Sequence, residues 1–171
     1  SLEAEVDAEA RRVFLEQLAS QSERLRRDFK LDLRVRGILS SSRMLLAEKG
    51  ASLGGWQQEF AAATTPADLG QFVEHVGADY LPHRVIIDCT ASGEVASHYA
   101  EWLAAGIHVV TPNKKANSAG MSTYRALAEA RRTGGSHYLY EATVGAGLPV
   151  IQTLRDLRQT GDEITSIEGI F

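Results

Sequence analysis

The chain has 171 residues, of which 44% are hydrophobic and 23% charged, and its formal net charge at pH 7 is −4. This describes an ordinary globular domain and excludes a disordered or fibrous chain. The acidic balance argues against nucleic acid as a partner. The single cysteine, Cys89, excludes a disulfide framework and fits a reducing compartment. No apolar run approaches the roughly 20 residues of a membrane span, so we expect a cytoplasmic protein without a membrane partner.

The first half of the chain combines one long helix with shorter elements. Apolar residues at spacings of three, four and seven predict an amphipathic helix from about Leu2 to Phe29. The alternation from Leu31 to Leu39 predicts a half-buried strand that leads into the loop Ser40–Arg43. The stretch that follows is rich in glycine and threonine, and it predicts two short helices, at Trp56–Ala62 and Ala67–Val76.

From residue 83 onward, short apolar runs alternate with longer helical patterns. The strands have continuous apolar sequences, which is typical of a parallel sheet covered by helices on both faces. We therefore expect an α/β fold. The predicted strands are Val85–Asp88, His108–Thr111, His137–Glu141 and Ile164–Phe171, and the predicted helices are Glu94–Ala105, Ser122–Arg132 and Leu148–Gln159.

Three loops follow strands in this pattern, namely Thr90–Gly93, Pro112–Lys115 and Thr143–Pro149. Sheets of this kind bind ligands beyond the carboxyl ends of their strands, where such loops meet. In the first loop, Ser92 either helps to present the backbone to a nucleotide or simply caps a helix. In the second, Lys114 and Lys115 either meet an anion or carbonyl group or form a solvated pair.

The third loop contains Gly145-Ala146-Gly147, and Glu141 precedes it. Its backbone carbonyls could coordinate a hard cation, or the segment could be a tight turn without an ion. The five histidines are scattered without metal-ligand spacing, so we expect structural roles for them. Trp56 and Trp102 are expected in the core.

Taken together and in order, three segments resemble homoserine dehydrogenase. They are Thr111–Asn117, Tyr140–Pro149, and Thr160–Glu163 followed by Ile167–Phe171. The resemblance runs from about Val13 to Phe171, and the part through Trp56 is most similar to the dehydrogenase half of bifunctional aspartokinase/homoserine dehydrogenases. It implies an NAD(P)-dependent oxidoreductase of threonine and methionine biosynthesis, which reversibly reduces L-aspartate 4-semialdehyde to L-homoserine.

The resemblance also assigns roles to individual residues. Lys114 matches the lysine beside the nicotinamide and substrate, which implies both catalytic and cofactor-binding roles. Ser41 and Arg43 lie where the adenosine ribose is read, and they could receive a 2′-phosphate, which favours NADP over NAD without excluding NAD. The remaining assignments are the cofactor loop Thr90, Ala91 and Ser92, and a monovalent-cation site, expected to hold sodium, made by Glu141 and the carbonyls of Val144, Ala146 and Leu148.

Both ends of the sequence depart from the family pattern. The family's first strand and its Gly-x-Gly-x-x-Gly turn are absent, and residues 1–12 form an acidic helical lead-in. We expect a Rossmann-like cofactor domain at 13–148 and the start of a catalytic and dimerisation region at 149–171. On this view the chain alone is an inactive fragment, and sheet edges left open by the missing strand favour a homo-oligomer.

Two other interpretations remain open. The chain could be a non-catalytic nucleotide-fold module that oligomerises or regulates. Alternatively, it could belong to another dehydrogenase of the same broad fold, acting on aspartate itself or on aspartate semialdehyde by phosphorylation. The last reaction requires a nucleophilic cysteine, and Cys89 lies inside an apolar run that exposes it poorly.

Overall fold

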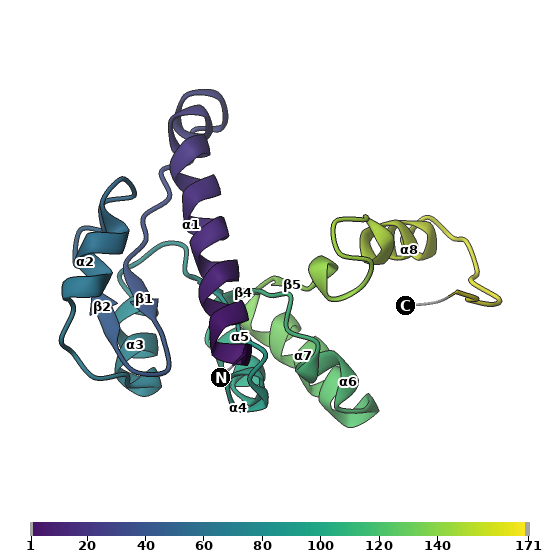
Figure 1. The fold of residues 1–171 in the computed structure, drawn as a ribbon. Coiled ribbons are helices and arrows are strands. Elements are labelled where there is room, and N and C mark those ends of the chain that lie inside the picture. The colour runs from purple at the N-terminus through teal and green to yellow at the C-terminus, as the bar shows by residue number, and fades with distance from the viewer. Residues whose placement is uncertain (1, 170–171) are drawn as a thin grey trace. The chain divides into compact units, whose positions relative to one another are not determined.

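The computed structural model describes the backbone of residues 2–169 and the side chains of residues 7–169 (Figure 1). Ser1, Ile170 and Phe171 lie outside the described residues. The chain divides into two compact units, Ser1–Arg84 and Val85–Phe171. Among the described residues, no helix is both long and apolar enough to cross a membrane. Each unit has its own small sheet, so we describe them separately.

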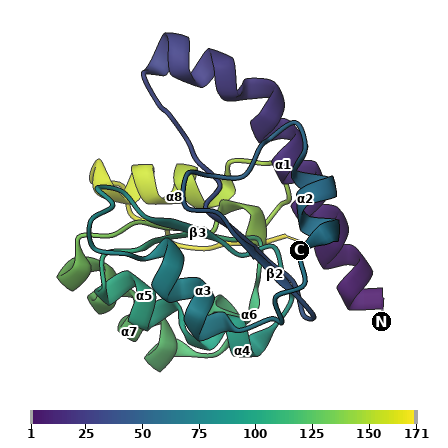
Figure 2. The ribbon, with the colours of Figure 1, turned by 90° about the vertical axis from the view of Figure 1, so that its left-hand side faces the viewer.

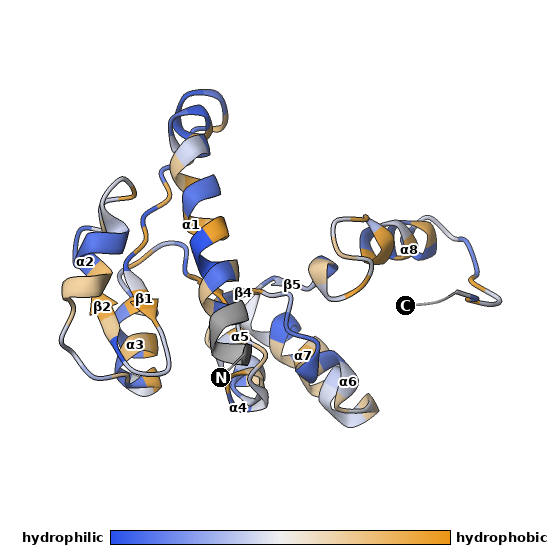
Figure 3. Cartoon of the chain, in the orientation of Figure 1, coloured by the Kyte–Doolittle hydropathy of each residue, from blue (hydrophilic) through white to orange (hydrophobic). Residues whose placement is uncertain are grey.

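The first unit combines a two-stranded antiparallel hairpin with three helices. The hairpin strands are apolar along their length (Figure 3) and pair Gly37 with Leu46, Ile38 with Leu45 and Leu39 with Met44. The predicted helices at residues 2–29, 56–62 and 67–76 are confirmed, although the last begins at Leu69 because Asp68 caps it by accepting a hydrogen bond from the Gln71 N–H at 2.9 Å. The elements are α1 (Leu2–Phe29), β1 (Gly37–Leu39), β2 (Met44–Leu46), α2 (Trp56–Ala62) and α3 (Leu69–Val76).

The core of this unit is built around Leu15 of α1, Ile38 of β1 and Trp56 of α2, which are 3–5% exposed. Trp56 is therefore a core residue, as predicted. Val13 of α1 is 38% exposed, whereas Leu15 is buried. Residues two positions apart point about 200° apart around a helix, so only one of these two can face the core.

The strand predicted from Leu31 to Leu39 is wrong over its first six residues. Only Gly37–Leu39 is a strand, and Leu31 and Leu33 are 48% and 47% exposed. The cause is the partner strand β2, which ends at Leu46, shortly before the chain turns at Gly50 with a φ of 96°. No ladder partner is therefore available for residues 31–34 among the described residues.

The second unit is a three-stranded parallel sheet with the order β3-β4-β5. Val85 to Ile87 pair with His108 to Val110, and Val109 and Val110 pair with Tyr138 and Leu139. The predicted alternation of strands and helices is confirmed. The elements are β3 (Val85–Ile87), α4 (Gly93–Ser97), α5 (Tyr99–Ala104), β4 (His108–Val110), α6 (Lys115–Ser118), α7 (Met121–Gly134), β5 (Tyr138–Leu139), the 3₁₀ turn η1 (Glu141–Thr143) and α8 (Val150–Gln159).

Helices α4 to α7 lie on one side of this sheet (Figures 1 and 2). The strand residues on one face, Ile86, Val109 and Tyr138, are at most 6% exposed, and Trp102 at 3% joins them in the core as predicted. Tyr99 of α5 contacts Tyr138 with ring centroids 5.7 Å apart. The apolar residues of the other face are more open, with Val85, Ile87 and Leu139 exposed by 38–47%.

Several boundaries of this unit differ from the sequence predictions. The helix expected at residues 94–105 is divided at His98 into α4 and α5, and the helix α6 was not predicted. Helix α7 continues to Gly134 because Gly135 adopts a left-handed conformation, with a φ of 62°, and caps it. The strand predicted at Ile164–Phe171 is wrong for residues 164–169, which form no ladder with any described residue. Its last two residues lie outside the described range.

Candidate functional site

The polar loops of the second unit lie at one edge of the parallel sheet. Parallel strands point the same way, so the residues that follow them, Asp88 after β3, Thr111 after β4 and Tyr140 after β5, emerge at the same edge. The loop Thr90–Gly93 and the turn Pro112–Lys115 are therefore neighbours. This arrangement is the one expected from the sequence.

Asp88 follows the outer strand β3 at this edge and is 4% exposed. Its Oδ1 accepts a hydrogen bond from the backbone N–H of Thr90 at 2.7 Å. Its Oδ2 accepts one from Asn113 Nδ2 at 3.1 Å and a short one from the Tyr99 hydroxyl. Three donors thus converge on one buried carboxylate, and they come from three different segments.

Asn113 joins the two loops. Its Nδ2 also donates to the carbonyl of Ser92 at 2.9 Å, and its Oδ1 accepts from the backbone N–H of Lys115 at 3.0 Å. Thr111 adds a second link, since its hydroxyl donates to the carbonyl of Asp88 at 3.0 Å and accepts from the Asn113 N–H at 2.8 Å. The loops after β3 and β4 are consequently held as one body.

Four residues, Asp88, Tyr99, Thr111 and Asn113, form this buried network, and each is at most 4% exposed. Burial raises the pKa of the Tyr99 hydroxyl, and its hydrogen bond to Asp88 raises that pKa further. Sequence reasoning assigned none of the four a role. The available signal was the placement of small polar residues directly after apolar strands, in positions where an unpartnered polar side chain would be costly to bury.

The predicted cofactor-binding residues of this unit lie on or beside the network. Ser92 caps α4 by accepting from the Val95 N–H at 3.3 Å, and Thr90 Oγ1 accepts from the Ser92 N–H at 3.1 Å. Ala91 is exposed between them. Lys114 is exposed at the start of α6, directly after the anchored Asn113. The fixed backbone therefore presents an open surface with the exposed side chains of Lys114 and Lys115 beside it.

The predicted ribose-binding loop, Ser40–Arg43, belongs to the first unit and connects β1 to β2. Ser40 closes the turn, because its hydroxyl donates to the Arg43 carbonyl at 3.1 Å and accepts from the Arg43 N–H at 3.2 Å. Ser41 is exposed. The guanidinium of Arg43 donates through Nη1 to the carbonyl of Ala61, near the end of α2, at 3.0 Å. Its other nitrogens make no hydrogen bond to the described residues.

Glu141, the side chain of the predicted cation site, has a structural task of its own. Its two carboxylate oxygens accept from the N–H groups of Ile151 and Gln152, both at 2.8 Å, and so cap α8. The Leu148 carbonyl accepts from the Val150 N–H at 2.9 Å. The carbonyls of Val144 and Ala146 accept no hydrogen bond from the described residues. The carbonyls of Val144 and Ala146 thus fit a cation better than the Glu141 carboxylate does. Both oxygens of that carboxylate already accept hydrogen bonds and have only their remaining lone pairs for an ion.

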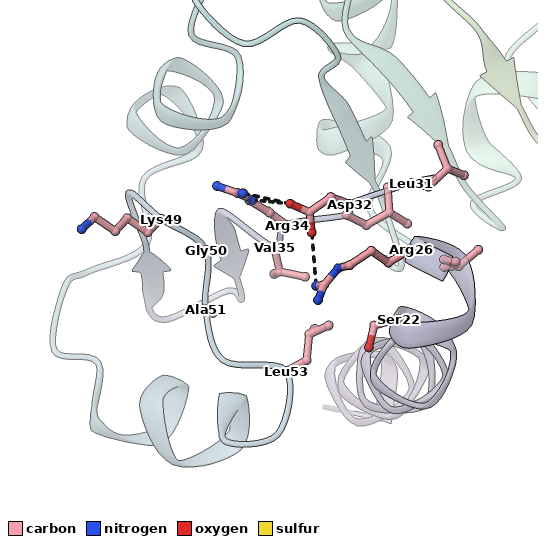
Figure 4. Close-up of a pocket in the computed structure, with 12 residues that line it drawn as sticks. Ser22, Arg26, Leu31, Asp32, Arg34, Val35, Lys49, Gly50, Ala51 and Leu53 are labelled. Carbon is pink, nitrogen blue, oxygen red and sulfur yellow. Dashed lines mark hydrogen bonds and ion pairs between the residues drawn. The ribbon is translucent and has the colours of Figure 1, made fainter. Parts of the chain in front are cut away.

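A separate pocket of about 640 Å³ lies in the first unit (Figure 4). It lies at the end of the hairpin opposite the loop Ser40–Arg43, because its lining residues precede β1 or follow β2. Its two guanidinium groups, of Arg26 and Arg34, both bind the carboxylate of Asp32, at 3.3 and 2.9 Å (Figure 4). The pocket therefore belongs to a different unit from the loops after β3 and β4. Its two arginines are already paired with Asp32.

A parallel strand-and-helix sheet with polar loops held at its carboxyl edge defines a nucleotide-binding α/β domain. Residues 12–141 match the family described as homoserine dehydrogenase, NAD binding domain. The chain belongs to this family. It is also 51% identical over 158 residues to a chloroplastic bifunctional aspartokinase/homoserine dehydrogenase of Zea mays, and 38% identical over 151 residues to a homoserine dehydrogenase of Saccharomyces cerevisiae.

The chain is much shorter than these relatives. The match covers 92% of this chain but only 17% of the Zea mays protein, and 81% of this chain but 42% of the yeast protein. A Candida auris protein of unknown function superimposes with a TM-score of 0.75 at 29% identity, over 93% of this chain and 42% of that one. A hyperthermophilic archaeal homoserine dehydrogenase solved with NADPH gives a TM-score of 0.61 at 22% identity, over 82% of this chain and 44% of that one. At 22% identity, the likeness shows the fold alone.

Proposed function

We propose that this chain supplies the NADP(H)-binding part of a homoserine dehydrogenase, which reversibly reduces L-aspartate 4-semialdehyde to L-homoserine in threonine and methionine biosynthesis. The observation that carries the proposal is the buried network around Asp88, which anchors the loops after β3 and β4 to each other. Dinucleotides bind beyond the carboxyl ends of the strands in folds of this kind, and the network holds two loops together at that place. When bound, the cofactor supplies the hydride.

Each predicted cofactor-binding residue then has its own role. Thr90, Ala91 and Ser92 let the cofactor approach the backbone closely, because their side chains are small. The ammonium of Lys114 lies beside the nicotinamide and, in the catalytic role proposed here, polarises the aldehyde oxygen and stabilises the negative charge that develops on it. The loop containing Ser41 and Arg43 receives the 2′-phosphate, for which the guanidinium of Arg43 would leave the Ala61 carbonyl.

A monovalent cation, with sodium as the expected ion, is proposed at the loop between β5 and α8. The carbonyls of Val144 and Ala146 would be its first ligands, joined by the carbonyl of Leu148 and by Glu141. Gly145 and Ala146 support this proposal, since both have left-handed backbones with φ values of 69° and 52° that give the loop a sharp bend. The ion would fix the loop between η1 and α8.

We also propose a homo-oligomer in the cytoplasm. Oligomerisation is supported by the exposed apolar residues Val85, Ile87 and Leu139 of the second sheet. A reducing compartment is supported by the single cysteine, Cys89. The plant relatives are named as chloroplastic, so the compartment needs a direct measurement by fractionation. A light-scattering mass of one chain would contradict the oligomer.

Cofactor titration tests the proposed function. NADPH and NADH are titrated into the purified chain by calorimetry, and we expect NADPH to bind more tightly. Arg43→Ala should weaken NADPH binding about tenfold or more and leave NADH binding within about twofold, because only NADPH has the 2′-phosphate. Arg34→Ala is the matched control, since Arg34 is an exposed arginine of the same unit that binds Asp32 instead.

Lys114 has its own control in Lys115, since both are exposed and each substitution removes one positive charge. Lys114→Ala should weaken NADPH binding more than Lys115→Ala does. Equal effects would assign both lysines to nonspecific attraction of the phosphates. If the unchanged chain binds neither cofactor at millimolar concentration, the non-catalytic module described above becomes the better account.

A further inference from the structure

We propose that Asp88 and Asn113 are positioning residues: the buried Asp88 carboxylate and the Asn113 carboxamide set the geometry of the turn that presents Lys114 relative to the loop Thr90–Ser92. The proposal rests on the cofactor-binding role assigned to these loops above. Neither side chain is required to touch the cofactor. Their effect passes through the backbone of the two loops that they join.

Both oxygens of the Asp88 carboxylate face hydrogen-bond donors. The Thr90 N–H and the Asn113 carboxamide nitrogen can only donate, and they bind different oxygens of the carboxylate at 2.7 and 3.1 Å. The Tyr99 hydroxyl donates to the second oxygen as well. Asp88 makes no ion pair with a basic side chain among the described residues, so three hydrogen bonds alone hold this buried carboxylate.

The orientation of the Asn113 carboxamide follows from a different contact. The backbone N–H of Lys115 can only donate, and it lies 3.0 Å from Oδ1, which identifies the other atom as the nitrogen. That nitrogen must therefore point at Asp88 and at the Ser92 carbonyl, 2.9 Å away. One planar group thus transmits the position of the first loop to the peptide that follows Lys114.

Substitutions that keep the size of these two side chains can separate the effect of their hydrogen-bonding groups from the effect of their shape. Asp88→Asn keeps the size of the side chain but replaces one acceptor oxygen by a donor, which must face either the Thr90 N–H or the donors at Oδ2. Asn113→Asp also keeps the size, but it places a second carboxylate against the first. The exchanged pair, Asp88→Asn with Asn113→Asp, restores one donor and one acceptor at their contact. Only the Ser92 carbonyl is then left facing an oxygen.

The test combines two measurements on the whole 171-residue chain. Hydrogen exchange is measured without cofactor at one reporter amide in each single variant. The reporter is the Lys115 amide in Asp88→Asn and the Thr90 amide in Asn113→Asp. Each reporter therefore lies in the loop that was not substituted. NADPH titration then reports affinity in both single variants and in the exchanged pair. Asn117→Asp is the matched control, because it adds the same charge to α6, and its retained oxygen can still accept from the Tyr138 hydroxyl.

We expect both reporter amides to exchange about tenfold faster in the single variants, and NADPH affinity to fall about tenfold to hundredfold. The exchanged pair should return to within about threefold to fivefold of the unchanged chain, since the two effects are coupled. Asn117→Asp should leave both readouts within about twofold. If Asp88→Asn does not fold, Asn113→Ser provides the same comparison by removing the carboxamide without adding charge.

Three results would overturn the proposal. The reporter amides could remain unchanged, NADPH affinity could remain unchanged although the chain binds NADPH, or the exchanged pair could be weaker than both single variants. If the unchanged chain does not bind NADPH, the proposed function fails. The exchange measurement still decides whether the two loops are coupled.

Discussion

Removing the Tyr99 hydroxyl is the substitution whose effect the structure specifies best. Tyr99 is fully buried, and its hydroxyl donates to Asp88 Oδ2 and lies 3.0 Å from Thr111 Oγ1. Tyr99→Phe retains the ring, which packs against Trp102 and Tyr138 at centroid distances of 5.8 and 5.7 Å. The change therefore removes one hydrogen bond to a buried charge and almost no apolar contact.

A hydrogen bond to a charged group contributes about 1.5–3 kcal/mol. For a chain of this length, each kcal/mol corresponds to about 2–4 °C in Tm, so we expect Tm to fall by about 3–12 °C at pH 7. Thermal and urea unfolding followed by circular dichroism measure both quantities. Tyr124→Phe is the control, because Tyr124 is 47% exposed and its hydroxyl makes no hydrogen bond to the described residues.

The same variant has a distinct pH dependence. Burial and Asp88 raise the pKa of Tyr99 in the folded state, so its stabilising contribution is complete below the ordinary tyrosine pKa of about 10 and is lost as pH rises through the folded-state pKa. As pH rises above about 10, the unchanged chain should lose more stability than Tyr99→Phe does, because its unfolded state releases the Tyr99 proton before its folded state does. Equal slopes, or a Tm change below about 1 °C at pH 7, would refute the description of this hydroxyl as a buried donor.

Three further substitutions test other parts of the structure. Gly134→Ala should destabilise the chain by about 3 kcal/mol or more in urea unfolding, because its Cβ would lie 1.9 Å from the Leu103 carbonyl oxygen; Gly93→Ala, with open space around it, should be neutral or slightly stabilising. Glu141→Gln should speed hydrogen exchange in the first turn of α8 severalfold, because the amide retains one of the two capping oxygens; unchanged exchange would contradict the cap. Asp68→Ala should cost about 1 kcal/mol through the lost cap of α3, and a neutral result would contradict that contact.

Local sequence patterns predicted the elements of the second unit well. The strands β3 and β4 each contain a short apolar run, and a helical pattern separates them, so periodicity identifies both kinds of element although it does not show the division at His98. The polar loops at the carboxyl edge followed from this alternation. Ser92 illustrates the agreement, since its predicted capping role is present.

Features that depend on distant contacts could not be predicted in this way. The hydrogen bonds of Asp88 reach residues 11 and 25 positions away, so no local pattern contains them. The strand β2 has only three residues and exists because it pairs with β1. Similarly, Glu141 caps a helix ten residues further along, a contact that its position after a strand does not indicate.

In the proposed function, the loops after β3 and β4 form a cofactor site. The most direct test is a titration of NADPH into the ¹⁵N-labelled chain, followed residue by residue in two-dimensional NMR spectra. We expect saturable shifts at Thr90 to Gly93 and at Asn113 to Lys115, with further shifts at Ser41 and Arg43. Shifts confined to the pocket beside Arg26 and Arg34, or no shifts at millimolar NADPH, would contradict it.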